Sequence, residues 1–130
     1  MNIRFLNISE IIEIHKEEII AAGGSEGIRD IGLLESAVGA VQATFEDKYL
    51  MNIFEMAATY INSIIFNHPF IDGNKRTAAA TALTFLYLNG YEINEKYDEE
   101  LADKLLDLVN KKIDKEELTV YLKDNSSNIE

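Results

Sequence analysis

The chain has 130 residues, of which 47% are hydrophobic and 27% are charged, a balance typical of one globular domain with a single hydrophobic core. Acidic side chains number 23 and basic ones 12, so the formal net charge is −11 at pH 7. This excess of negative charge argues against a protein whose main partner is nucleic acid or an anionic membrane. The absence of cysteine excludes disulfides, zinc–thiolate sites and a cysteine nucleophile.

The N-terminal segment and the apolar runs of the chain suggest neither export nor membrane insertion. Charged residues interrupt the N-terminal 18 residues before a signal-peptide apolar region could form. The longest nearly uninterrupted apolar run, residues 78–88, is much shorter than the roughly 20 residues that span a bilayer. We therefore expect a soluble, cytoplasmic domain.

The first half of the chain predicts three helices. Apolar residues at helical spacing favour a helix that begins near Asn7 or Ser9 and ends at the two glycines 23–24. Asp30 is the expected N-cap of a second helix that reaches residue 41. Residues 44–49 break the pattern and predict a loop or short hairpin. Residues 52–66 then have a broad apolar face, which suits a central buried helix.

The second half predicts three more helices. Residues 67–73 contain the one proline of the chain and are expected to form a loop. Residues 74–88 are expected to be helical again, and a very short strand is expected near 91–93. Asp98 is expected to cap a helix that carries the apolar residues Leu101, Leu105, Leu106 and Val109. Asp114 is expected to cap a last short helix, with Glu117 three positions on as in a capping box. We predict one all-α domain, residues 1–123, a compact bundle of about six helices with at most a short hairpin, and a frayed tail, residues 124–130.

The chemistry is concentrated in the loop that leads into the helix at residue 74. The first amides of a helix lack intrahelical partners and carry partial positive charge, so they bind anions. Gly73 permits a tight turn, and Lys75 and Arg76 add two cations at the same place. Asp72 would not bind phosphate directly but could hold a Mg²⁺ ion that bridges to phosphates. His68 is the plausible general base, because imidazole titrates near neutral pH.

Each of these residues also has an ordinary interpretation. A histidine before a proline is more often a loop residue bonded to backbone than a base, and an Asp-Gly pair is a common turn. Phe70 is expected to anchor the core, and His15 to be structural or solvated. Arg29 could form a local ion pair with Asp30. The functional interpretation is favoured because His68 and residues 72–76 converge on one loop and one helix start.

Residues 68–76, HPFIDGNKR, resemble the signature of the Fic/Doc superfamily in its Doc (death on curing) form, H-x-F-x-[D/N]-[A/G]-N-K-R, at every specified position. Shorter similarities extend along residues 23–90. The resemblance implies the all-α Fic/Doc core. It also implies that His68 deprotonates a target hydroxyl, that Asp72 helps to hold Mg²⁺ or orients the acceptor, and that the amides of residues 73–75 bind the phosphates of ATP together with the side chains of Lys75 and Arg76.

The resemblance also bears on the reaction. Fic adenylyltransferases have glycine at the position of Lys75 and a second arginine at the position of Ala79. The Doc branch, which has the lysine, resembles a protein kinase that passes the γ-phosphate of ATP to a serine or threonine of a translation factor, with Lys75 beside His68 and Asp72 among the catalytic residues. We prefer this reaction. The alternatives are a protein adenylyltransferase and a non-catalytic Fic/Doc binding module.

Two expectations about partners follow from the resemblance. Residues 44–48 would form a flap that lays the target over the site as an added strand. We do not expect an inhibitory helix with the pattern S/T-x-x-x-E-G/N. Ser9 and Glu13 have the spacing but are followed by isoleucine, and the pair Ser126 and Glu130 has no glycine or asparagine after it in the given sequence. We therefore expect inhibition in trans by a cognate antitoxin whose segment folds on binding and covers the site. Nucleic acid and membranes are not expected partners.

Overall fold

The computed structural model describes residues 2–94 and 98–130, and most of them are helical. The elements in chain order are α1 (Ile8–Ala22), α2 (Ile31–Ala40), β1 (Thr44–Phe45), β2 (Lys48–Tyr49), α3 (Ile53–Asn67), α4 (Asn74–Leu88), β3 (Tyr91–Ile93), α5 (Asp98–Val109), α6 (Lys115–Asp124) and β4 (Ser126–Asn128). The strands form two small antiparallel pairs, β1 with β2 and β3 with β4. The expected helical bundle with a short hairpin is confirmed. Within the described part of the chain, no helix is both long and apolar enough to cross a bilayer.

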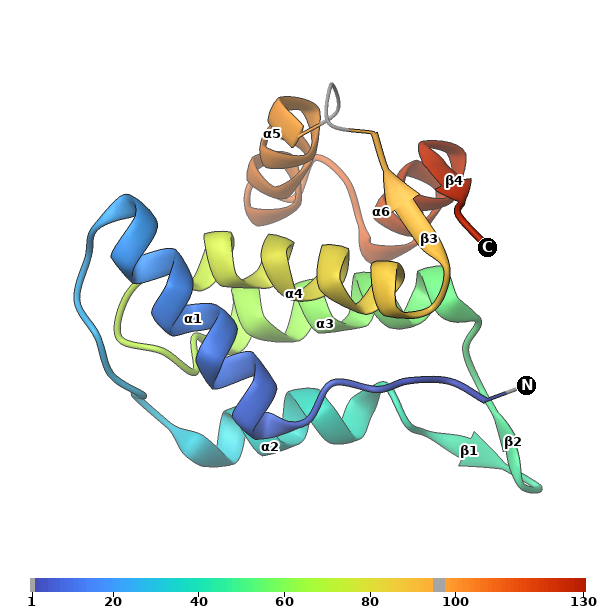
Figure 1. Ribbon diagram of the computed structural model, residues 1–130, viewed down its shortest axis with the longest axis horizontal. Coiled ribbons are helices and arrows are strands. Elements are labelled where there is room, and N and C mark those ends of the chain that lie inside the picture. The colour runs from blue at the N-terminus through green and yellow to red at the C-terminus, as the bar shows by residue number, and fades with distance from the viewer. Residues whose placement is uncertain (1, 95–97) are drawn as a thin grey trace.

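Helices α3 and α4 form the centre of the molecule (Figure 1). They lie side by side and antiparallel, joined at one end by the loop over residues 68–73. Helix α3 buries side chains around most of its circumference, as its apolar composition predicts. The face of α4 that has small side chains, Thr77, Ala78, Thr81 and Ala82, is fully buried, which allows close helix packing. The other helices surround this pair.

Most helix starts are closed by a side chain. Asn7, Asp30, Asn52 and Asp114 each accept a hydrogen bond from an amide in the first turn of α1, α2, α3 and α6, which satisfies a donor that the helix leaves free. Helix α4 differs, because its N-cap is Gly73, in the left-handed conformation (φ 75°), and no side chain caps it. Its first amides are therefore left open toward the loop.

The C-terminal residues correct the expectation of a frayed tail. Residues 126–128 form β4, paired with Tyr91–Ile93, and the Ile129 amide donates to the Gly90 carbonyl oxygen at 2.9 Å. The side chain of Glu130 lies over Gly90, so closely that a Cβ at this glycine would be 2.7 Å from its Cδ. A polar Ser-Ser-Asn segment carries no strand signal of its own. Its conformation comes from the partner strand, which is distant in sequence.

The buried face of α5 differs by one position from the expected stripe. Leu101, Leu105 and Leu108 are buried, whereas Leu106 and Val109 are exposed. Both sets have helical spacing, so periodicity alone did not decide which face meets the core.

Candidate functional site

His68 lies at the junction between α3 and the loop. It is the C-cap of α3, with a left-handed backbone (φ 49°, ψ 61°), and its amide donates to the Ile64 carbonyl oxygen. Its side chain is exposed and makes no hydrogen bond within the described residues. A left-handed conformation costs a non-glycine residue about 1–2 kcal/mol. The structure around His68 therefore has to hold it there, and it leaves the imidazole free to meet another molecule.

Arg29 holds this junction. Its Nε donates to the His68 carbonyl oxygen and its Nη2 to the Asn67 carbonyl oxygen, both at 2.6 Å. The two carbonyls belong to the C-terminal end of α3, where a cation is favourable. The alternative interpretation of Arg29, a local ion pair with Asp30, does not apply, since Asp30 caps α2 instead. The sequence contained no signal for this role, because Arg29 is 39 residues from His68 along the chain.

The connection between α1 and α2 encloses the other side of the loop. The Ser25 amide donates to Asp72 Oδ2 at 3.0 Å, and the Gly73 amide donates to Asp72 Oδ1 at 2.8 Å. Both hydrogen bonds lower the pKa of the Asp72 carboxyl group, and the bond from Ser25 has the larger effect. Gly24 has to be a glycine here, because a Cβ would lie 2.6 Å from Asp72 Oδ2 and its φ is +127°. The carboxylate is therefore held in place as an anion.

Two buried side chains, His15 and Asn74, contact the loop on the side that faces the core. His15 is 2% exposed, its ring stacks on that of Phe70 with centroids 3.9 Å apart, and its Nε2 donates to the Asp72 carbonyl oxygen at 2.8 Å. Asn74 accepts from the Phe70 amide through Oδ1 and donates to the Phe70 carbonyl oxygen through Nδ2. The structural interpretation of His15 and the core role of Phe70 are confirmed. Both polar atoms of the Asn74 side chain are therefore bonded to the backbone of Phe70.

The first turn of α4 brings the cations to the same place. The amides of Asn74 and Lys75 lie in the uncapped turn, but the Gly73 amide, which was expected to bind phosphate, is bonded to Asp72 instead. Arg76 Nη2 donates to the Gly23 carbonyl oxygen at 2.9 Å. Lys75 is exposed and has no partner within the described residues. The arrangement offers one free ammonium group, one oriented guanidinium group and open amides to an anion.

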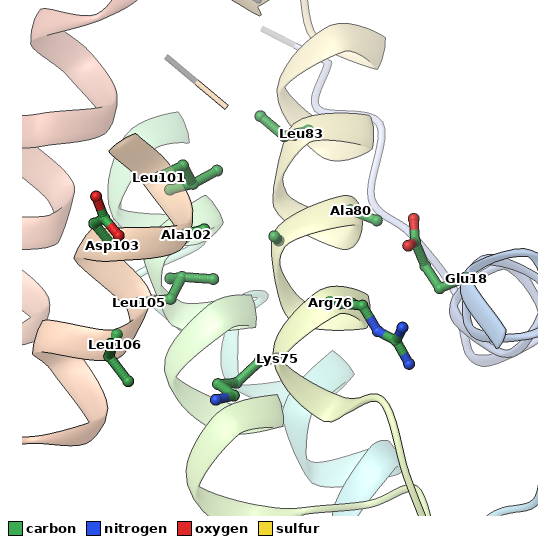
Figure 2. A pocket seen from close by; sticks show the side chains of 11 residues that line it. Glu18, Lys75, Arg76, Ala80, Leu83, Leu101, Ala102, Asp103, Leu105 and Leu106 are labelled. Atoms are coloured by element: carbon green, nitrogen blue, oxygen red, sulfur yellow. The ribbon is translucent and has the colours of Figure 1, made fainter. Parts of the chain in front are cut away.

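A groove begins at this helix start. Its volume is about 490 Å³, and its lining is mainly the small or apolar side chains of α4 and α5, among them Ala79, Ala80, Leu83, Leu101 and Leu105. Figure 2 shows Lys75 directed from α4 toward the α5 side and Arg76 directed toward α1, with Glu18 of α1 beyond it. An apolar groove that ends at two cations suits a ligand with an apolar and an anionic part.

Asp72 is the candidate metal ligand. No group of three or more histidine, aspartate or glutamate side chains that could enclose an ion occurs in residues 2–94 and 98–130. Each oxygen of Asp72 accepts one backbone hydrogen bond and retains a free lone pair. One carboxylate beside a phosphate site fits Mg²⁺, which is commonly held by one or two carboxylates together with phosphate oxygens. The donor set does not fit a structural metal site.

The hairpin does not lie over this site, contrary to the expected flap. Tyr49 of β2 packs edge to face on Phe5, and Phe5 stacks on Phe85 near the C-terminal end of α4. His68 and Lys75 are at the other end of α4, a helix of 15 residues and so about 22 Å long. The segment that does lie beside the loop is Ile28, which forms an antiparallel bridge with Phe70.

The chain is similar to known proteins over most of its length. The model of the Fic/DOC family matches residues 5–86. A protein named Toxin Doc from Mycolicibacterium smegmatis is 42% identical over 92 residues, which cover 69% of this chain and 70% of the relative. A protein named Protein kinase doc from Escherichia phage P1 is 38% identical over 100 residues, which cover 77% of this chain and 78% of the relative.

Proposed function

The chain belongs to the Fic/Doc family, in the branch of the Doc toxins, and from this premise we propose that it is the toxin of a toxin–antitoxin pair. It transfers the γ-phosphate of ATP to a serine or threonine hydroxyl of a translation factor. The observation that carries the proposal is the arrangement at one end of the α3–α4 pair. There a free imidazole, an anchored carboxylate and an uncapped helix start with two cations flank a single loop.

Each residue has a role in this reaction. His68 accepts the proton of the target hydroxyl, whose oxygen forms a bond to the γ-phosphorus while the bond to the β-phosphate oxygen breaks and ADP leaves. The amides of Asn74 and Lys75 and the side chains of Lys75 and Arg76 hold the phosphates. Asp72 would hold Mg²⁺, which would neutralise phosphate charge when bound. The remaining contribution of the protein is to position these groups.

Two features of α4 favour phosphoryl transfer over adenylyl transfer. Lys75 stands in the first turn with its side chain toward the groove between α4 and α5 (Figure 2), where a glycine would let phosphates approach the backbone closely. Ala79, one turn after Lys75, brings no second guanidinium group to the groove. An adenylyltransferase with this sequence would have to bind the α-phosphate without the glycine and without the second arginine.

The groove also offers a way to inhibit the toxin. An amphipathic antitoxin segment that folds into the apolar groove between α4 and α5 would reach Lys75 and Arg76. It would then exclude the phosphates of ATP.

The protein target would dock at a different place, the extended segment at Ile28, instead of the hairpin. The Ile28 amide and carbonyl have no backbone partner among the described residues, so they can pair with an added strand.

The test is label transfer in a cell lysate with ATP labelled separately at the α- and γ-phosphate. We expect label from the γ-phosphate only, on one protein band, lost in His68→Ala. Label from the α-phosphate would overturn the kinase assignment in favour of adenylyl transfer. Bound ATP without any transfer, measured by calorimetry, would favour the non-catalytic binding module.

A further inference from the structure

A second group of cations lies at the turn between α5 and α6. Lys111, Lys112 and Lys115 fall within five residues, in a chain with only 12 basic side chains and a net charge of −11. Lys111 and Lys112 are exposed, and Lys111 has a left-handed backbone (φ 60°) that turns the chain here. This turn therefore holds a quarter of the basic side chains of the chain, although Asp114, Glu116 and Glu117 also lie within residues 111–117.

The three lysines line a groove together with the C-terminal half of α3. The groove has a volume of about 360 Å³, and its other walls include Asn62, Phe66, Leu108 and Ile113. Phe66 is a large apolar side chain that is 44% exposed, and it precedes His68 by only two residues. We call this feature, defined by Phe66, Lys111, Lys112 and Lys115, the lysine groove. It lies at the same end of α3 as the proposed catalytic base.

Two acidic residues, Asp114 and Glu117, also line the groove, but within the described part of the chain they form no ion pair with the lysines. Asp114 and Glu117 form the capping box of α6, in which each carboxylate accepts a backbone amide of the other residue. Lys115 Nζ donates to Thr59 Oγ1 at 3.2 Å, and Thr59 is 7% exposed. The one ion pair found among residues 2–94 and 98–130 joins Arg4 and Glu10. Among the described residues the three ammonium groups form no ion pair. With three lysines and two carboxylates, the lining keeps a net positive charge, which favours an anionic ligand.

We propose that the lysine groove binds an acidic segment of the protein substrate, beside the hydroxyl that His68 activates. This inference rests on the proposed function, and it specifies the class of substrate. Acidic side chains of the target pair with Lys111 and Lys112 while an apolar side chain contacts Phe66. The acidic character of the rest of the surface repels long polyanions such as nucleic acid, whereas the lysines attract negative charge. A short acidic stretch of a protein is therefore the ligand that fits both the surface and the groove. The phosphates of ATP already have their site on α4.

The first test is direct binding of fluorescent peptides, read by anisotropy. The peptides contain one threonine and one phenylalanine with six glutamates, and a matched peptide has six glutamines. The variant is Lys111→Glu/Lys112→Glu, which leaves the Lys115 contact with Thr59 intact. The control is Lys48→Glu/Lys123→Glu, with the same change in net charge at two exposed residues of the hairpin and α6.

We expect the glutamate peptide to bind the wild type at least ten times more tightly than the glutamine peptide. The groove variant should lose about tenfold or more in affinity, and the control variant less than threefold. Raising the salt concentration should weaken the wild-type complex and leave the variant nearly unchanged. Equal binding of both peptides, equal losses in both variants, or displacement of the peptide by tripolyphosphate at equal charge would overturn the proposal.

The second test separates this proposal from the proposed function. Transfer of γ-label to the lysate protein is measured against target concentration, with ATP affinity measured by calorimetry. We expect the groove variant to raise KM for the target about tenfold, with kcat and ATP affinity within twofold of the wild type. If the groove variant has an unchanged KM and normal transfer, the proposed role of the lysine groove is refuted and the proposed kinase activity stands. Tight glutamate-peptide binding without any transfer by the wild type would overturn the kinase and leave the groove.

Discussion

Replacing Arg29 by alanine should slow phosphoryl transfer more than it destabilises the fold. The guanidinium group donates to the carbonyl oxygens of Asn67 and His68 at 2.6 Å each. These bonds close the C-terminal end of α3 and hold His68 in the left-handed region. Without them, His68 can relax to a right-handed or extended backbone, and its imidazole then points elsewhere.

The size of the effect follows from two costs. The left-handed backbone of His68 costs about 1–2 kcal/mol, and a cation at an exposed helix C-terminus contributes about 0.3–1 kcal/mol beyond the neutral hydrogen bonds it makes. Arg29 is exposed, so water partly replaces it and the loss of global stability should be about 1 kcal/mol. Release of about 1–2 kcal/mol of local strain lowers the competent population of His68, and hence kcat, about 5- to 30-fold.

The assay compares transfer of γ-label with chemical denaturation for Arg29→Ala, Arg29→Lys and Arg4→Ala. Arg4 is a matched control, because it also bonds a carbonyl oxygen, that of Phe5, and pairs with Glu10 far from the loop. It should cost similar stability without loss of kcat. Arg29→Lys keeps the charge but loses the paired N–H donors of the guanidinium group, so its kcat should lie between those of the wild type and Arg29→Ala. Backbone chemical shifts of His68 report its conformation independently of activity.

The reasoning would be refuted if Arg29→Ala kept kcat within twofold of the wild type. It would equally fail if Arg4→Ala lost as much kcat, or if the shifts of His68 showed the left-handed backbone retained in Arg29→Ala.

Three further changes test the loop. The folded pKa of Asp72 lies below its ordinary value, so its contribution to stability is present above about pH 4 and is lost as the pH falls below that value. Unfolding measured against pH should show a shallower acid slope in Asp72→Asn, and an unchanged slope would contradict the hydrogen-bond pattern. Gly24→Ala places a Cβ 2.6 Å from Asp72 Oδ2 at φ +127° and should cost about 1–3 kcal/mol. Its control, Gly39→Ala, meets no atom within 4 Å inside α2 and should gain about 0.5–1 kcal/mol in thermal unfolding. Asn74→Ala leaves the Phe70 amide and carbonyl unpaired in a buried place and should cost about 2–4 kcal/mol, whereas a loss below 1 kcal/mol would mean that the loop does not need this clamp.

Local features were predictable because their causes are local. The helices follow from apolar spacing, and the caps Asn7, Asp30 and Asp114 each act on the amide three residues away. The same holds for the uncapped start of α4, since Gly73 has no side chain with which to cap it. The motif therefore indicated both the fold class and the place of the candidate site.

What the sequence by itself determined is thus the helices, the loop and the charges that the loop carries. The tertiary structure decided what holds that loop: Arg29 at the end of α3, His15 beneath Phe70, and Ser25 on Asp72. It also decided that β4 pairs with β3 and that the hairpin lies at the far end of α4 from His68. These contacts join residues tens of positions apart, and their pairing depends on how whole helices pack, which the spacing of residues within one segment does not specify.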